Sequence, residues 1–146
     1  MPAPAVADKV TFKPETLAAL HDGLWLVVNG SGTGGRARIA GRDVSGKTGT
    51  AHKLEGRGYA ANRYISSFVG FAPVSNPRIV VAVMVDEPGA GQYYGGLVAA
   101  PVFSEVTGGA LRLMGVAHDA PVEKIVLPAA PVINTRMLSV VRSNRT

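Results

Sequence analysis

The chain has 146 residues, 47% of them apolar, which suits one modest domain with a buried core, or a piece of a larger one. It contains no cysteine, which excludes thiol chemistry, disulfides and cysteine-ligated zinc. The formal net charge is +5, but the basic residues are scattered and form no block or aromatic ladder, so nucleic-acid binding is not expected.

The sequence gives no sign of a membrane segment or a secretory signal. The longest apolar run, Ile79 to Val85, is far shorter than the roughly 20 residues of a membrane helix. The start, MPAPAVADK, lacks the basic and apolar regions of a signal peptide. We therefore expect neither element in this chain, and an exported protein would carry its targeting segment elsewhere.

The first expected element is an amphipathic helix within residues 12–30. Pro14 and Glu15 suit its first turn, and Asn29 with Gly30 suits its end. Its apolar residues recur at helical spacing: Leu17, Leu20, Leu24, Val27 and Val28.

About four strands are expected next. Residues 36–41 and 42–51 are the first two, with Gly41 between them as a hairpin turn. Residues 63–73 and 78–88 follow, joined through the turn VSNP. The continuous apolar run from Ile79 to Val85 indicates a strand covered on both faces, in the middle of the sheet.

A second helix is expected over residues 97–115. The order of elements predicts an α+β fold, an antiparallel sheet with an N-terminal and a C-terminal helix packed on it. Residues 1–116 form the expected domain portion, and the proline-punctuated residues 117–146 are expected to be flexible or peripheral.

The stretch GRDVSGKTGT, residues 41–50, fits two incompatible chemistries. From Gly41 it matches the phosphate-binding P-loop, which requires a helix that begins at Lys47 and Thr48. The residues that follow carry three glycines and no helical period, so the P-loop is the less favoured alternative. The second possibility is the K-T-G motif of serine penicillin-recognising enzymes.

On an edge strand, K-T-G has definite chemical uses. Lys47 and Gly49 share one face and Thr48 points to the other, so the ammonium group reaches a cleft where a carboxylate or a serine hydroxyl could use its charge. Gly49 allows a close backbone approach. A twist or bulge could return the Thr50 hydroxyl to the cleft, and the Thr50 amide could donate to an oxyanion. The free strand edge could pair with an extended peptide.

Further motifs accompany K-T-G-T-A: F-x-G-F-A-P, V-x-x-D-E-P, and Y-Y-G-G leading to A-P-V-F. With them, the stretch from Val10 to Val116 resembles the C-terminal part of the transpeptidase domain of class B penicillin-binding proteins of the division type, the FtsI or penicillin-binding protein 3 family.

The resemblance implies a partial serine β-lactamase-like fold and a D,D-transpeptidase that cross-links peptidoglycan stem peptides during septal synthesis and is acylated by β-lactams. It assigns Lys47, Thr48, Gly49 and Thr50 to the strand that binds substrate and β-lactam, with Lys47 and Thr50 as supporting catalytic residues. Tyr93 and Tyr94 would lie near the cleft mouth, with simple packing over the last helix as the alternative.

The same resemblance implies no cofactor and no metal, and the three histidines have no metal-ligand spacing. The implied partners are stem peptides, β-lactams, the missing N-terminal part of the domain and divisome proteins. The implied location is the periplasmic face of the inner membrane.

One departure from the family pattern is decisive for activity. Such enzymes use a nucleophilic serine in S-x-x-K and a second motif S-x-N, both before K-T-G, and the sequence contains no S-x-x-K. The stretch SVVR at Ser139 has an arginine, which cannot act as a base, and it follows K-T-G. We therefore expect the chain to be inactive alone. We favour a fragment of a transpeptidase, and the alternatives are a relative that binds peptide or β-lactam without turnover and a fold with a repurposed site.

Overall fold

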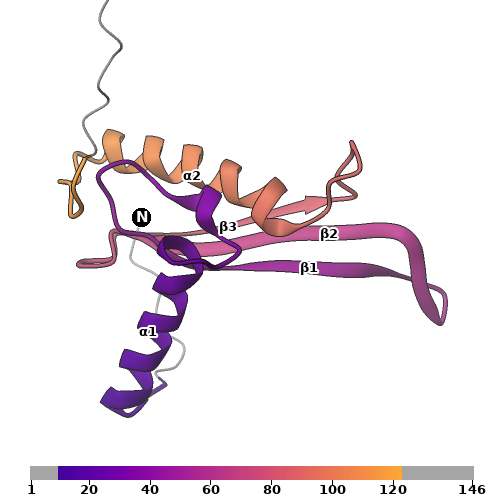
Figure 1. Ribbon diagram of the computed structural model, residues 1–146, viewed down its shortest axis with the longest axis horizontal. Coiled ribbons are helices and arrows are strands. Elements are labelled where there is room, and N and C mark those ends of the chain that lie inside the picture. Colours follow the sequence, from indigo (N-terminus) through magenta and orange to yellow (C-terminus); the bar gives the residue numbers. More distant parts are fainter. Residues whose placement is uncertain (1–9, 123–146) are drawn as a thin grey trace, which may run out of the picture.

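The computed structural model describes residues 10–122, which form an antiparallel sheet with a helix before it and a helix after it (Figure 1). In chain order the elements are α1 (Pro14–Asn29), the 3-10 helix η1 (Gly35–Ala37), β1 (Ser45–Glu55), β2 (Gly58–Ala72), β3 (Ile79–Asp86) and α2 (Gly95–Leu113). The three strands lie in the order β1-β2-β3. The α+β fold and the antiparallel meander are confirmed.

The expected strand over residues 36–41 does not form, so the sheet of the described region has three strands where about four were expected. Its first residues form η1, which buries Ala37, and the Arg38 carbonyl accepts a hydrogen bond of 2.6 Å from the Ser104 hydroxyl of α2. The chain then turns at Gly41, whose φ is +73°, with a single bridge between Ile39 and Arg42. These contacts require a coiled segment rather than an extended one.

The first two strands form a hairpin that reaches well beyond the helices (Figure 1). Glu55 pairs with Gly58, and Gly56 in the turn between them has a φ of +61°, the left-handed region that favours glycine. The sequence pattern missed this extension because residues 52–62 are polar and rich in glycine.

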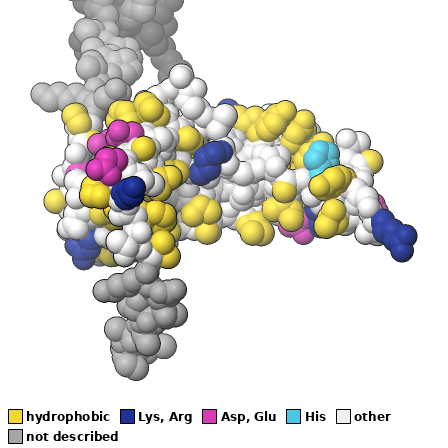
Figure 2. All heavy atoms as spheres, turned by 90° about the horizontal axis from the view of Figure 1, so that it is seen from below, with side chains coloured by type: hydrophobic (Ala, Val, Ile, Leu, Met, Phe, Trp, Pro, Cys, Tyr) yellow, Lys and Arg dark blue, Asp and Glu magenta, His cyan; other side chains and the backbone are white. Residues whose placement is uncertain are grey.

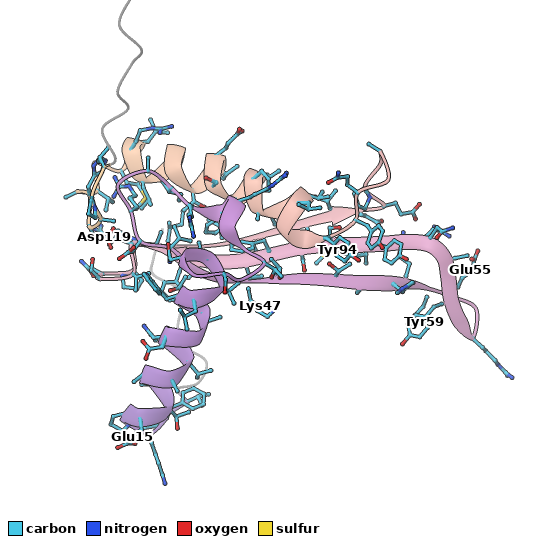
Figure 3. All side chains as sticks on the ribbon, in the orientation of Figure 1. Glu15, Lys47, Glu55, Tyr59, Tyr94 and Asp119 are labelled. Atoms are coloured by element: carbon cyan, nitrogen blue, oxygen red, sulfur yellow. The ribbon has the colours of Figure 1, made fainter. Side chains whose placement is uncertain are left out.

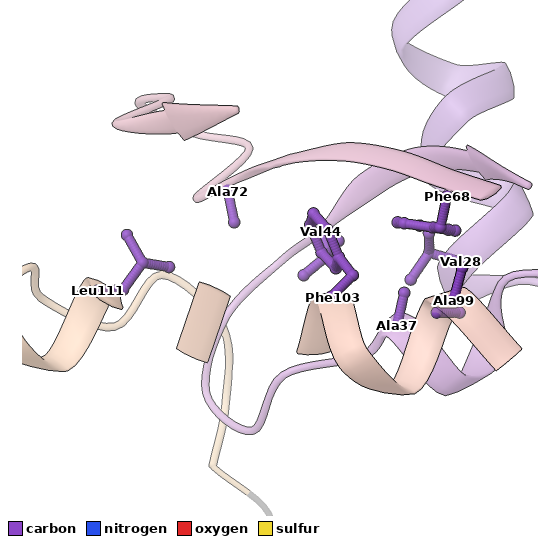
Figure 4. Close-up of a cluster of buried hydrophobic side chains, with 9 residues drawn as sticks. Val28, Ala37, Val44, Phe68, Ala72, Ala99, Phe103 and Leu111 are labelled. Atoms are coloured by element: carbon purple, nitrogen blue, oxygen red, sulfur yellow. The ribbon is translucent and has the colours of Figure 1, made fainter. Parts of the chain in front are cut away.

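The core lies between the sheet and α2, which covers one face of it (Figure 4). Phe68 of β2 and Phe103 of α2 are fully buried, and their ring centroids lie 4.7 Å apart. Burying two aromatic side chains of this size is a large part of the hydrophobic stabilisation available to so small a sheet.

Helix α1 projects from the other side of the sheet and packs mainly through its C-terminal end (Figure 1). Val28 is buried there, and the Asn29 side chain donates to the Val44 carbonyl over 2.8 Å. The Arg38 guanidinium caps the helix, because its Nε and Nη2 donate to the carbonyls of Val28 and Asn29, both over 2.9 Å. Four apolar side chains elsewhere along the helix stay exposed: Leu17, Leu20, Trp25 and Leu26.

The prediction that Ile79 to Val85 lies mid-sheet with both faces covered is wrong within the described residues. β3 is the last strand of the sheet, and its side chains alternate between packed and exposed. Val81 and Val83 pack towards the core, whereas Val80 is 71% exposed and Met84 74% exposed. The reason is that α2 covers only one face.

The first residues of the expected tail are held against the body. The buried Arg42 guanidinium donates to the Val116 carbonyl and to the Ala117 carbonyl, the latter over 2.6 Å, and the Asp119 carboxylate accepts the Asp43 amide over 3.0 Å. The rest of that tail, residues 123–146, lies outside the described residues. None of the helices within residues 10–122 combines the length and the apolarity of a membrane span.

Candidate functional site

The K-T-G residues lie in β1, at an edge of the sheet. One side of β1 pairs with β2, so that Lys47 lies opposite Val69 and Gly49 opposite Ser67. Within residues 10–122 no strand pairs with its other side. Such an edge presents unpaired backbone groups that can pair with an extended peptide. Because Lys47 is in a strand and no helix begins there, the P-loop alternative is wrong.

Lys47, which is labelled on β1 in Figure 3, lies on the opposite face of this edge strand from the two threonines. Thr48 lies opposite the buried Phe68, on the face that α2 covers, whereas Lys47 projects to the uncovered face beside Val69. Its Nζ donates to the Thr48 carbonyl over 2.9 Å, and no carboxylate of the described region lies within ion-pairing distance of it. The ammonium charge is therefore available to a ligand or to another part of a protein.

A cavity of about 300 Å³ adjoins the other face of the strand. Its lining consists of Thr33, Thr48, Thr50, Tyr94, Gly95, Gly96 and Leu97. The hydroxyls of Thr33 and Thr48 lie 2.7 Å apart, and the Thr50 hydroxyl accepts the Gly95 amide over 3.1 Å. Thr50 thereby satisfies one free amide of α2, and its own proton remains available to a ligand. Hydroxyl donors beside the amino end of a helix favour a negatively charged group such as a carboxylate.

The α2 amino end approaches the strands so closely that only glycine fits. A Cβ on Gly95 would lie 2.2 Å from the Ser67 carbonyl oxygen and 2.4 Å from that of Gly49. A Cβ on Gly96 would lie 2.0 Å from the Thr33 carbonyl oxygen. The Y-Y-G-G motif is thus explained by packing, and the close backbone approach expected at Gly49 is made by Gly95.

The two tyrosines lie in different surroundings. Tyr93 stacks on Tyr64, with centroids 4.1 Å apart and planes 11° apart, and its carbonyl accepts the buried Ser66 hydroxyl. Tyr94 lines the cavity and is more than half exposed. Its hydroxyl, 3.4 Å from that of Tyr93, raises the pKa of Tyr93. His52, 4.3 Å from Tyr64 between ring centroids, continues the row of rings along the hairpin.

An ion cluster holds the loop that carries the tyrosines. The Glu87 carboxylate accepts from Arg63 Nε over 2.9 Å and from Lys53 Nζ over 2.5 Å, and the Glu87 amide donates to the Tyr64 carbonyl over 2.9 Å. The hydrogen bonds from Arg63 and Lys53 lower the pKa of Glu87 to about 2. Sequence reasoning missed this cluster, because its members are separated by up to 34 positions. The described residues contain no group of three or more side chains suited to a metal ion.

Comparison with known proteins shows the family of the chain. Residues 2–108 match the family described as penicillin binding protein transpeptidase domain. The chain belongs to this family. It is 41% identical over 129 residues to the probable peptidoglycan D,D-transpeptidase PenA of Neisseria flavescens, covering 88% of this chain and 32% of the relative. It is 46% identical over 89 residues to the peptidoglycan D,D-transpeptidase FtsI of Escherichia coli, covering 61% of this chain and 15% of FtsI.

A solved transpeptidase domain shares the fold. The apo TP domain of penicillin-binding protein 3 from Burkholderia pseudomallei is 48% identical, with a TM-score of 0.67 over 75% of this chain and 33% of that chain. The resemblance to the FtsI and penicillin-binding protein 3 family is therefore confirmed. The chain spans no more than about a third of these relatives, so it corresponds to part of a transpeptidase domain.

Proposed function

We propose that this chain supplies the strand that binds substrate and β-lactam in a penicillin-binding D,D-transpeptidase, an enzyme that cross-links peptidoglycan stem peptides. The observation that carries the proposal is the edge of β1 that no strand of residues 10–122 covers, with the Lys47 ammonium, which has no ion-pair partner in that range, on one face and the Thr48 and Thr50 hydroxyls on the other.

The geometry suits an extended peptide with a terminal carboxylate. The peptide backbone pairs with the free edge of β1, and its carboxylate is bound by the hydroxyls at the cavity. The Lys47 ammonium, on the opposite face of the strand, offers its charge to the reacting serine hydroxyl. The Thr50 amide is the proposed oxyanion donor. Tyr94 forms an apolar wall of the cavity against the ligand, and Tyr93 holds Tyr94 in place.

The acylated serine comes from outside this chain, because the sequence contains no S-x-x-K. We propose that the residues that precede K-T-G in full-length relatives supply it, and that the chain alone does not react with penicillin. The proposed setting, at the periplasmic face of the inner membrane among divisome proteins, is supported by the relatives named FtsI.

A chimera tests the function directly. Residues 10–116 replace the matching third of the Burkholderia penicillin-binding protein 3 domain, and acylation by a fluorescent penicillin is followed in time. Removing one preorganised charge or donor from such a site costs about 10²–10³ in rate, so Lys47→Ala should slow labelling by about that factor. Arg57→Ala, a cation removed from the hairpin turn, is the control and should label normally.

Two results would count against the proposal. A chimera that folds but takes up no penicillin would show that this strand cannot replace that of the relative. Covalent labelling of the full chain by itself would show that the chain contains a nucleophile that the motifs do not reveal.

A further inference from the structure

The hairpin formed by β1 and β2 ends in exposed apolar side chains. Leu54 and Tyr59 lie opposite each other near its turn, and they are 74% and 75% exposed. The ring of His52 contacts the ring of Tyr59 edge to face, with centroids 5.9 Å apart. Figure 2 shows a histidine among hydrophobic side chains towards the end of the molecule that the hairpin forms. These three side chains are here called the tip platform.

The tip platform is continuous with the candidate site. His52 lies 4.3 Å from Tyr64 between ring centroids, and Tyr64 stacks on Tyr93. Tyr93 in turn contacts Tyr94, which lines the cavity. Figure 3 labels the two ends of this row, Tyr94 near the start of α2 and Tyr59 near the hairpin turn. A ligand bound at the cavity therefore has an aromatic surface beside it as far as the tip.

Within residues 10–122, the free edge of β1 is open to an extended peptide in one direction. Ser45 and Gly46, at the start of the strand, are buried, whereas Thr50 and the two residues after it are exposed. A peptide whose carboxylate lies at the cavity beside Thr50 cannot continue towards the buried end. It therefore runs along the free edge towards the hairpin turn.

The length of this edge determines which part of the substrate reaches the tip. From Thr50 to Glu55 there are five residue steps, roughly 17 Å at about 3.4 Å per residue. An extended peptide with its carboxylate at Thr50 thus brings its amino end to the tip platform after about five residues. In peptidoglycan the amino end of a stem peptide is attached to a sugar of the glycan strand. The group that arrives at Leu54 and Tyr59 is then a sugar.

The chemistry of the tip platform suits a sugar ring. Such a ring has a face of C–H groups, which packs on an aromatic ring, and a rim of hydroxyls, which bond to polar groups or to water. Tyr59 offers its ring to the face and its hydroxyl to the rim. Ion pairs hold the hairpin in place, because Lys53 lies 2.9 Å from Asp86, so the tip platform does not have to be ordered when a ligand binds.

We propose that the tip platform is a binding subsite for the sugar that carries the stem peptide. This inference rests on the proposed function. It extends the candidate site from the carboxylate end of the substrate to its carbohydrate end, and it makes Tyr59 a residue that distinguishes a stem peptide with its sugar from the same peptide without it.

The chimera described above tests the proposal by competition. Its labelling by fluorescent penicillin is followed in the presence of a free stem peptide or of a muramyl peptide, which is the same peptide with its sugar. We expect the muramyl peptide to halve the labelling rate at about one tenth of the concentration that the free peptide needs. Each rate is compared with the rate of the same variant without a competitor.

Two substitutions of Tyr59 and a control assign the difference to the tip platform. Tyr59→Ala should remove the tenfold difference between the two peptides, whereas Tyr59→Phe, which keeps the ring, should retain most of it. Leu113→Ala removes another highly exposed apolar side chain, at the end of α2, and should keep the full difference. Circular dichroism confirms that each variant is folded.

The outcomes separate this inference from the proposed function. A chimera that is not acylated, or that neither peptide protects, contradicts the function itself. An acylated chimera that both peptides protect equally overturns the sugar subsite, as does a Tyr59→Ala chimera that keeps the difference. A peptide whose amino end carries a cyclohexyl group examines the other occupant. If it protects as well as the muramyl peptide, the tip platform accepts any apolar group and the assignment to a sugar is wrong.

Discussion

Gly95, the first residue of α2, is the position at which one methyl group should do most harm. In Gly95→Ala the new Cβ would lie 2.2 Å from the Ser67 carbonyl oxygen and 2.4 Å from that of Gly49. Both oxygens belong to the paired strands β1 and β2, so α2 has to move away by more than an ångström. Overpacking of this kind costs about 1–3 kcal/mol, a large share of the roughly 5–15 kcal/mol of a typical domain.

Urea unfolding of the full chain, followed by circular dichroism, measures this cost. Gly109→Ala is the matched control, because it adds the same methyl group to the same helix, where nothing lies within 4 Å of the new Cβ. Alanine is favoured over glycine in a helix interior by about 1 kcal/mol, so this control should be more stable than the parent. A Gly95→Ala chain as stable as the parent would refute the packing argument.

Three further predictions concern other parts of the fold. The pKa of Glu87 is lowered from 4.5 to about 2, so its contribution to stability is complete above pH 4.5 and is lost as the pH falls towards 2. Thermal melts of Glu87→Gln at several pH values should therefore lack that part of the loss of stability in acid. Arg38→Ala removes the bonds that cap α1 and should lower stability by about 1–2 kcal/mol in urea titrations, with a loss of helical signal; an unchanged signal would contradict the capping role. Phe68→Ala leaves a cavity beside Phe103 and should lower the free energy of unfolding by about 3–5 kcal/mol in the same assay. A loss below about 1 kcal/mol would show that neighbouring side chains move in to fill the cavity.

The sequence predicted both helices to within two residues, because their apolar periods and end signals are local. It also predicted a strand at Lys47, since the glycines after Thr48 exclude a helix. It failed for residues 36–41, because contacts with α1 and α2 determine the backbone conformation there. It also failed for the hairpin tip, because pairing between β1 and β2 overrides a polar, glycine-rich composition.

The sequence placed Lys47 on a strand, but it did not predict how the residues of the candidate site are arranged. The alternation of a strand correctly separated Lys47 from Thr48. A twist or bulge could have returned the Thr50 hydroxyl to the face of Lys47, but the irregularity in β1 lies between His52 and Leu54. The Thr50 hydroxyl lies with that of Thr48 at the cavity. That cavity depends on how closely the amino end of α2 approaches the sheet, which no local pattern encodes.

The exposed side of α1 has one practical consequence. It carries Trp25, the only tryptophan of the chain, with 37% of the residue exposed. Indole emission moves to shorter wavelength when water leaves the ring, so the chain contains its own fluorescent reporter. The emission wavelength of Trp25, followed as a binding partner is added, would therefore report whether this side of α1 loses its contact with water, without any attached dye.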